Sequence, residues 1–251
     1  MADLPKGDKK LLNAWAFYDW ANSVYSLVIS SAVFPIFYEA LFSERSHYIT
    51  VFGFSLKNSA LISFVTAFAF LVVAFISPIL SGISDYVGNK KSFMKFFCYL
   101  GALSCVGLYW FSLENIYLSL VFYFLGLVGF WGSWVFYNSY LPDIAFAEQQ
   151  DAISAKGFSY GYIGSVILLV VNLAMIMMPD VFGISGTKGE AAMKAMRYSF
   201  VMVGIWWIVF SQYTYYYLPK GNKFVASKIK QNIIFNGYKE LQKVWHLLAE
   251  N

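Results

Sequence analysis

Six long apolar blocks dominate the chain and constrain what it can fold into. Each holds about 20 or more mostly apolar residues, the length that an α-helix needs to cross the hydrocarbon core of a bilayer. Only 13% of the residues are charged, whereas soluble domains carry about 25%. The blocks run over Ala14–Leu41, Ser59–Leu80, Phe93–Ser112, Ile116–Tyr140, Ile153–Met178 and Met196–Leu218. We therefore predict an all-α, polytopic membrane protein with six transmembrane helices.

The basic residues indicate the orientation of these spans. When Lys and Arg are assigned to alternate ends of the spans, 13 fall on the side of the two termini and 5 on the other side. Because cytoplasmic connections carry the excess of basic residues, both termini are predicted to be cytoplasmic. The first block is too long for the apolar core of a signal peptide, so it is expected to remain as a spanning helix. Short connections and the lack of a targeting peptide favour a bacterial inner membrane.

The chain divides into three predicted parts. Residues 1–12 form a cytoplasmic amino terminus, residues 13–219 form the transmembrane bundle, and residues 220–251 form a basic cytoplasmic tail. The tail holds six lysines among apolar residues at helical spacing. Two interpretations of it remain open: amphipathic helices on an anionic leaflet, or a linker to a further part of a longer protein.

Several function classes are not expected. Cys98 and Cys105 are seven residues apart in one span, about 10 Å along a helix, which is too far for a disulfide and predicts packing residues. His47 and His246 are isolated, so no metal site and no cofactor are predicted. No convincing carboxylate pair lies within the spans, so we do not expect an enzyme. The net charge is +4, and most of the basic residues lie in the termini and connections on one side of the spans. This distribution argues against a nucleic-acid binder.

The first span carries polar residues that have a cost in lipid. Asp19, Asn22, Ser26 and Ser30 are spaced 3, 4 and 4 residues apart, which predicts one shared helical face. An acid at a helix centre costs about 2.5–3.5 kcal/mol on insertion scales, so this face should contact protein or a water-filled cavity. Asp19 lies five residues inside the predicted span, a depth of about 8 Å. The alternative is an interfacial acid that is hydrogen-bonded to a neighbouring helix.

Two further spans carry patterned faces. In the fourth span, Trp131, Trp134 and Asn138 are spaced 3 and 4 residues apart and could line a cavity; ordinary aromatic packing or an interfacial belt is the alternative. In the fifth span, Gly157, Gly161 and Ser165 form a face of small residues that allows helices to approach closely. We interpret that second face as packing.

The connection between the second and third spans combines charge with a turn residue. In the segment SPILSGISDYVGNKKS, Asp85 is followed by Gly88 and then by Lys90 and Lys91. Gly88 suits a tight turn, and Asp85 can interact with helix N-terminal amides. This segment resembles the loop motif of the major facilitator superfamily, Gly-x-x-x-Asp-Arg/Lys-x-Gly-Arg-Lys/Arg, which joins the second and third helices of that fold. Asp85, Gly88 and Lys90 match, and the departures are Ser81 (with Gly82 after it), Tyr86 and Asn89.

Longer sequence blocks resemble one branch of this superfamily. AWAFYDWANSVYSLVISSAVFPIFY in the first span, and YNSYLPDIA and SAKGFSYGYIGS across the fourth and fifth spans, are similar to the branch that contains the autophagy-related vacuolar amino-acid effluxer. The resemblance covers the chain from Trp15 to about Leu218. It implies one half of a major-facilitator fold, built from two inverted three-helix repeats.

The resemblance also implies roles for the patterned residues. The solute site would lie between two six-helix halves, with the first and fourth spans lining it. The implied solute or proton-coupling residues are Asp19, Asn22, Ser26, Trp131, Trp134 and Asn138. Asp85, with Gly88, Lys90 and Lys91, would form a cytoplasmic gate that contacts the opposite half. Proton coupling through Asp19 would require burial to favour its neutral form.

The implied function is secondary active transport of a small polar solute, with amino acids as the expected class, by alternating access. The family pattern has twelve spans, so six spans imply a fragment, a truncated copy or a half that dimerises. We favour a fragment or truncation, because two identical halves need self-complementary faces. The expected partners are a solute, membrane lipid and a second half. The alternative is a non-transporting membrane scaffold or a regulatory half-transporter.

Overall fold

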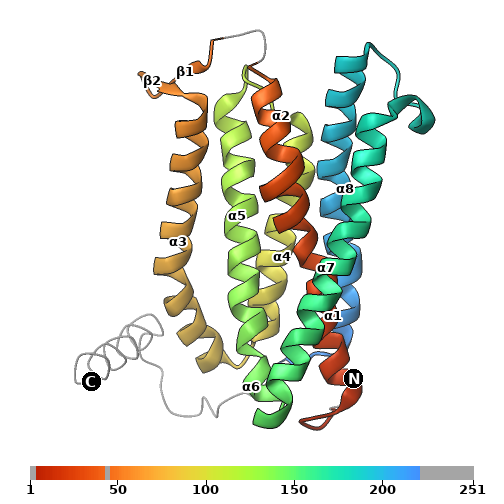
Figure 1. Cartoon of the computed structure of the whole chain (residues 1–251). Helices are drawn as coiled ribbons and strands as arrows, with labels where there is room; N and C mark the ends of the chain where they lie inside the picture. Colours follow the sequence, from red (N-terminus) through yellow and green to blue (C-terminus); the bar gives the residue numbers. More distant parts are fainter. Residues whose placement is uncertain (1–3, 43–45, 221–251) are drawn as a thin grey trace.

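Long helices stand side by side and run between two ends that hold the connections (Figure 1). The computed structural model describes residues 4–42 and 46–220, and it describes residues 82–87 without their side chains. The first span consists of α1 (Lys9–Val24), a π-helix (Tyr25–Val33) and α2 (Phe34–Ala40). The other elements are β1 (Tyr48–Val51), β2 (Phe54–Lys57), α3 (Asn58–Val87), α4 (Lys90–Gly107), a 3-10 turn (Leu108–Trp110), α5 (Ile116–Ser139), α6 (Leu141–Ile144), α7 (Ala147–Met177), a second 3-10 turn (Pro179–Phe182) and α8 (Lys188–Tyr217).

All six predicted spans are confirmed as helices that are long and apolar enough to cross a membrane. They cover Lys9–Ala40, Asn58–Ser81, Lys90–Trp110, Ile116–Ile144, Ala147–Met177 and Lys188–Tyr217. Most of them extend beyond the apolar blocks, because a helix continues through polar residues until a capping residue stops it. Asp8 caps α1 by accepting hydrogen bonds from the backbone N–H groups of Lys10 and Leu11 at 2.8 and 3.1 Å.

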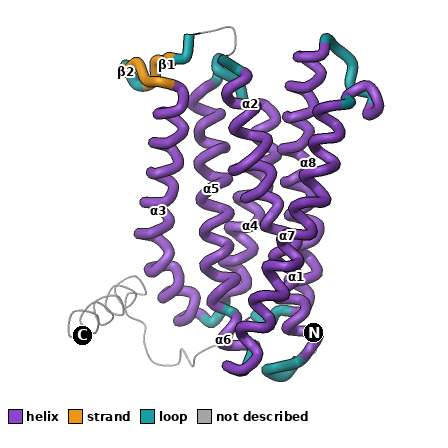
Figure 2. The backbone as a smooth tube through the Cα atoms, viewed as in Figure 1, coloured by secondary structure: helices purple, strands orange, loops and turns teal. Residues whose placement is uncertain are grey.

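The helices pack in a pattern with internal two-fold symmetry. α1 packs on α7 and α8, α5 packs on α3 and α4, and α4 packs on α8. Exchanging α1, α3 and α4 for α5, α7 and α8 reproduces each of these contacts. α1 and α5 cross the bundle in opposite directions (Figure 2). The bundle therefore consists of two inverted three-helix repeats, as the resemblance implied.

α4 and α5 approach most closely where both helices lack side chains. A Cβ atom on Gly129 would lie 2.3 Å from the backbone N of Gly101 and 2.8 Å from the carbonyl oxygen of Phe97. The two backbones are thus in direct contact, which is how small residues stabilise helix pairs in a membrane.

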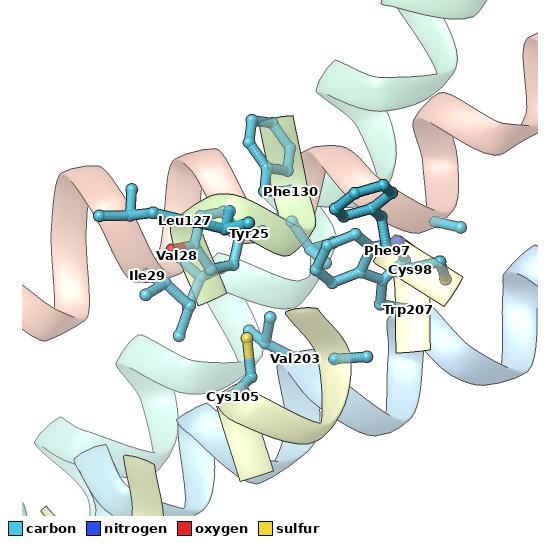
Figure 3. Close-up of a cluster of buried hydrophobic side chains, with 14 of the residues drawn as sticks. Tyr25, Val28, Ile29, Phe97, Cys98, Cys105, Leu127, Phe130, Val203 and Trp207 are labelled. Carbon is cyan, nitrogen blue, oxygen red and sulfur yellow. The ribbon is translucent and has the colours of Figure 1, made fainter. Parts of the chain in front are cut away.

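A buried cluster of large side chains surrounds this crossing (Figure 3). The two cysteines, Cys98 and Cys105, are fully buried in it as free thiols, which confirms the prediction that they are packing residues. The first span, α4, α5 and α8 contribute to the cluster, which includes Tyr25, Val28, Ile29, Phe97, Leu127, Phe130, Val203 and Trp207.

A short β-hairpin, which the sequence analysis did not predict, precedes α3. β1 and β2 pair antiparallel, with Val51 opposite Phe54, and the turn between them is Phe52–Gly53. Both turn residues have positive φ, 51° and 80°, as a tight hairpin turn requires. Phe-Gly is not one of the usual turn pairs, and four-residue strands are too short to show an alternating pattern.

The connection between α3 and α4 differs from the prediction. Asp85 does not lie in a loop, because α3 continues to Val87 and the connection consists of Gly88 and Asn89 alone. Gly88 has a φ of +64°, which confirms the predicted turn. The side chain of Asp85 lies outside the described part of the chain.

The two lysines of this segment fasten neighbouring helices. Lys90 forms an ion pair with Asp143 of α6 at 2.9 Å, and Lys91 donates to the carbonyl oxygen of Leu218 at 2.7 Å. Lys91 therefore satisfies a carbonyl group at the C-terminal end of α8. Both contacts lie at the end of the bundle that holds α6 and the amino terminus (Figure 1).

Thr187→Ala is expected to destabilise the start of α8. Thr187 and Glu190 form a capping box, in which the Glu190 carboxylate accepts from the backbone N–H and hydroxyl of Thr187 at 3.0 and 2.9 Å. Loss of such a cap costs about 1 kcal/mol. Thermal unfolding in detergent measures the change, with Lys188→Ala, which removes no capping contact, as the control. Equal melting temperatures for the two variants would contradict the prediction.

Candidate functional site

A cavity of about 300 Å³ lies between the first span, α5 and α7. Its lining combines one carboxyl group, several hydroxyl groups and large aromatic rings. The lining residues are Asp19, Ser23, Ser26, Leu27 and Ser31 of the first span, Phe130, Trp131 and Trp134 of α5, and Phe158, Gly161, Tyr162 and Ser165 of α7.

The structure brings together four of the six residues that the resemblance implied. Asp19, Ser26, Trp131 and Trp134 line the cavity, whereas Asn22 and Asn138 do not. Asn22 is buried and accepts a hydrogen bond from the hydroxyl of Ser23 at 3.3 Å. The exposed Asn138 donates to the carbonyl oxygen of Trp134 at 2.9 Å.

Half of the predicted polar stripe of the first span lines the cavity: Asp19 and Ser26 do, whereas Asn22 and Ser30 do not. The backbone changes from α to π geometry at Tyr25, which adds residues to each turn and rotates the later side chains to new directions. Ser31 donates to the carbonyl oxygen of Ser26, five residues earlier, at 2.9 Å. Consequently Ser31 lines the cavity and Ser30 does not. Apolar periodicity gives no signal for such a change of helix type.

Asp19 is deeply placed and its carboxylate has a defined partner. The side chain is 4% exposed, and its Oδ2 accepts a hydrogen bond from the hydroxyl of Tyr137 at 3.0 Å. Because α1 starts at Lys9, Asp19 lies ten residues into the helix, about 15 Å from the start of the helix. A buried carboxylate of this kind is costly unless it is hydrogen-bonded or protonated.

Tyr137 is in turn positioned by the first span. Trp15 donates from its indole Nε1 to the backbone carbonyl of Tyr137 at 2.9 Å, and the two rings stack with centroids 4.3 Å apart. The Tyr18 ring also packs against the Tyr137 ring, with the two ring centroids 5.1 Å apart. These contacts link α1 to α5 and hold the Tyr137 hydroxyl next to Asp19.

The small-residue face of α7 packs on α1 directly over the carboxyl group, which confirms the packing interpretation. A Cβ on Gly157 would lie 2.6 Å from Asp19 Oδ2, and a Cβ on Gly161 would lie 2.6 Å from Ser23 Oγ. The same face reaches the cavity, because Gly161 and Ser165 are among the lining residues. The spacing of these small residues predicts the packing but gives no signal for the cavity.

The α7 wall could have been found from the sequence. Phe158, Gly161, Tyr162 and Ser165 follow the spacing of one helical face, and all four line the cavity. This face was missed because it mixes aromatic, small and hydroxyl residues, so its hydropathy does not differ from that of the rest of the apolar span.

Residues 157–161 also match the pattern Gly-x-Ser-x-Gly of a hydrolase nucleophile turn. That pattern requires a strand, a sharp turn and a helix, whereas these residues lie within α7. Ser159 is exposed and donates to the carbonyl oxygen of Ala155, an ordinary contact of a helical serine.

Positive charge is absent from the lining. Among the described residues, no Lys, Arg or His lines the cavity or forms an ion pair with Asp19. Lys156, next to Gly157, donates instead to Asn13 Oδ1 at 2.6 Å and lies 5.6 Å from the ring centre of Tyr160. The cavity therefore has acidic and aromatic character.

Comparison with known proteins agrees with the fold. The family described as "Vacuole effluxer Atg22 like" matches residues 7–251. The chain is 34% identical over 226 residues to the uncharacterized MFS-type transporter YxiO of Bacillus subtilis (strain 168), which covers 87% of this chain and 50% of that protein. It is 28% identical over 185 residues to an uncharacterized protein of Aquifex aeolicus (strain VF5), covering 73% of this chain and 43% of that protein.

The chain spans about half the length of the curated relatives it matches. No solved structure matches it. The match to the family extends over both inverted repeats and includes every residue of the cavity. This multi-pass membrane chain belongs to the Atg22-like vacuole effluxer family of MFS-type proteins.

Proposed function

We propose that the chain forms one wall of a secondary active transporter that moves a small polar solute by alternating access. The observation that carries the proposal is the buried carboxyl group of Asp19 in a cavity between the first, fourth and fifth spans. Intramembrane acids that face a cavity are costly and typically serve transport. The first and fourth spans are equivalent helices of the inverted repeats, and such helices line the central site of this kind of fold.

Amino acids are the proposed solute class. The description of the matching family names a vacuole effluxer, and the relative YxiO is named as an MFS-type transporter. The hydroxyl groups of Ser26 and Ser165 offer polar contacts, whereas Trp131 and Trp134 offer apolar surface for a side chain. A volume of about 300 Å³ on this wall is of the size of a small-molecule site.

A second six-helix half is proposed to complete the site. The chain corresponds to about half of its relatives, and the cavity has a wall on one side only. We propose that this half is part of the same polypeptide, with residues 220–251 as the linker; a second copy of the chain is the other arrangement. Residues 221–251 lie outside the described part of the chain.

The proposed orientation places both termini in the cytoplasm of a bacterium, with the bundle in the inner membrane. The end that holds the amino terminus also holds Lys90, Lys91 and Lys156. Asp85, Gly88, Lys90 and Lys91 lie at that end, so we propose that they form the cytoplasmic gate, away from the solute cavity.

Asp19 is proposed to carry the coupling proton. In the complete gene product, reconstituted in liposomes, Asp19→Asn is expected to lower uptake of radiolabelled amino acids driven by a pH gradient at least about tenfold, because the amide cannot exchange a proton. Asp180→Asn, in the exposed turn after α7, is the matched control and should retain uptake.

Unchanged gradient-driven uptake in Asp19→Asn would contradict the coupling role. Absence of uptake for every amino acid in the unmodified protein would contradict the proposed solute class. Saturable solute binding without any flux would favour the alternative of a non-transporting, regulatory half.

A further inference from the structure

We propose that the cavity wall formed by the first span, α5 and α7 recognises the protonated amino group of its solute, with Asp19 as the counter-ion. This inference rests on the proposed function and names the part of the solute that this half of the site binds. It extends to amines that have no carboxylate.

The charges of the wall support a cationic ligand. Among the residues that the structure describes, Asp19 is the single carboxyl group of the lining, and no basic side chain lines the cavity. The Asp19 carboxylate accepts one hydrogen bond from Tyr137, at 3.0 Å, although a carboxylate can accept about four. An ammonium group would supply both the missing donors and the opposite charge, whereas a solute carboxylate would be repelled.

The hydroxyl groups of the first span are arranged as acceptors. Ser26 Oγ donates its proton to the carbonyl oxygen of Ser23 at 2.9 Å, and Ser31 Oγ donates to the carbonyl oxygen of Ser26 at 2.9 Å. Ser23 Oγ donates to Asn22 Oδ1 at 3.3 Å. Each hydroxyl has one proton, so with these hydrogen bonds in place the three groups accept from a ligand. An ammonium group has three donors and no acceptor, and it therefore matches this wall.

One buried hydroxyl faces the cavity without a partner. Ser165 is 3% exposed, and its Oγ has no hydrogen-bond partner among the described residues. Ser165 lines the cavity from α7, across from the first span. A buried polar group without a partner is costly, so a ligand that contacts it gains binding free energy.

The aromatic rings complete the match to a cation. Trp131 and Trp134 line the cavity with ring centroids 5.6 Å apart and planes at 88° to each other. Tryptophan is the best aromatic partner of a cation, because its ring faces carry negative potential. The same rings can contact an apolar or aromatic side chain of the solute.

A matched series of three probes separates charge from shape. 2-Phenylethylamine, 2-phenylethanol and 3-phenylpropionate share one ring and a two-carbon spacer, and at pH 7 they are cationic, neutral and anionic. Titration calorimetry on the complete gene product in lipid nanodiscs is expected to show the amine binding at least about tenfold more tightly than the alcohol, since a charge-assisted contact is added. The propionate should bind most weakly.

Two variants test whether Asp19 and Trp134 cause the preference for the amine. Asp19→Asn is expected to bind the amine and the alcohol equally, whereas Asp180→Asn should retain the preference. Trp134→Leu is expected to weaken amine binding about threefold or more, through loss of a cation–π contact. Trp110→Leu, an exposed tryptophan outside the cavity, is its control.

The outcomes distinguish this inference from the proposed function. Tight binding of the alcohol or the propionate, or a preference for the amine that survives Asp19→Asn, would overturn the inference while transport could still be measured. The comparison among the three probes in the unmodified protein remains decisive even if a variant fails to fold. If none of the probes binds and no flux is observed, both proposals fail.

Discussion

Gly129→Ala is expected to destabilise the bundle by at least about 2 kcal/mol, the largest stability effect of the substitutions considered. The new methyl group would lie 2.3 Å from the backbone N and 2.4 Å from the Cα of Gly101. No side chain can rotate to relieve this contact, because the atoms that it meets belong to the backbone of α4. The two helices must therefore separate, and the interlocked cluster around Phe97 must shift with them.

Thermal unfolding in detergent measures this effect, and a melting temperature lowered by roughly 5 °C or more is expected. Gly189→Ala is the matched control, because nothing lies within 4 Å of the Cβ position at Gly189 in the first turn of α8. There the same change should leave stability equal or slightly higher, since alanine favours helix. Equal melting temperatures for the two variants would refute the close crossing of α4 and α5.

The fold was largely predictable because bilayer thickness links apolar length directly to helix length. Each of the six apolar blocks became a spanning helix. The ends were less accurate, since Asp8 and Thr187 stop their helices through hydrogen bonds that hydropathy does not detect. The hairpin around Phe52–Gly53 was missed for a related reason: its turn depends on backbone angles, not on a usual residue pair.

The site was predictable only in part, even where a helix stays regular, since Asn22 of α1 and Asn138 of α5 do not line the cavity. Trp131 and Trp134 lie on the uninterrupted helix α5, and their spacing correctly placed them on one face. Helical spacing does not place Ser30 correctly, because the first span changes to a π-helix. The partner of Asp19 could not be found by spacing at all, since Tyr137 is 118 residues away in sequence. Only the packing of α1 against α5 and α7 brings these groups together.

Gly157→Ala is expected to impair transport strongly with little loss of stability. The added methyl group would lie 2.6 Å from Asp19 Oδ2 and 3.0 Å from the hydroxyl of Tyr137, so it occupies the space that the hydrogen-bonded pair requires. Unlike the backbone contact at Gly129, this overlap involves the ends of two side chains, and the Asp19 carboxyl group can rotate away. The carboxyl group then leaves its position in the cavity wall, and uptake driven by a pH gradient should fall at least about tenfold, as errors of about 1 Å in a functional geometry often cause.

Ser159→Ala provides the control on the same helix, because Ser159 is exposed and its hydroxyl donates to the carbonyl oxygen of Ala155 within the helix. Uptake assays and melting temperatures should be measured together for both variants. Reduced uptake at an unchanged melting temperature in Gly157→Ala, with normal uptake in Ser159→Ala, would support a role of Asp19 that depends on its position. If Gly157→Ala transports normally, then the contact between Asp19 and Tyr137 is dispensable, and the carboxyl group acts without the fixed position that the packing of α7 imposes on it.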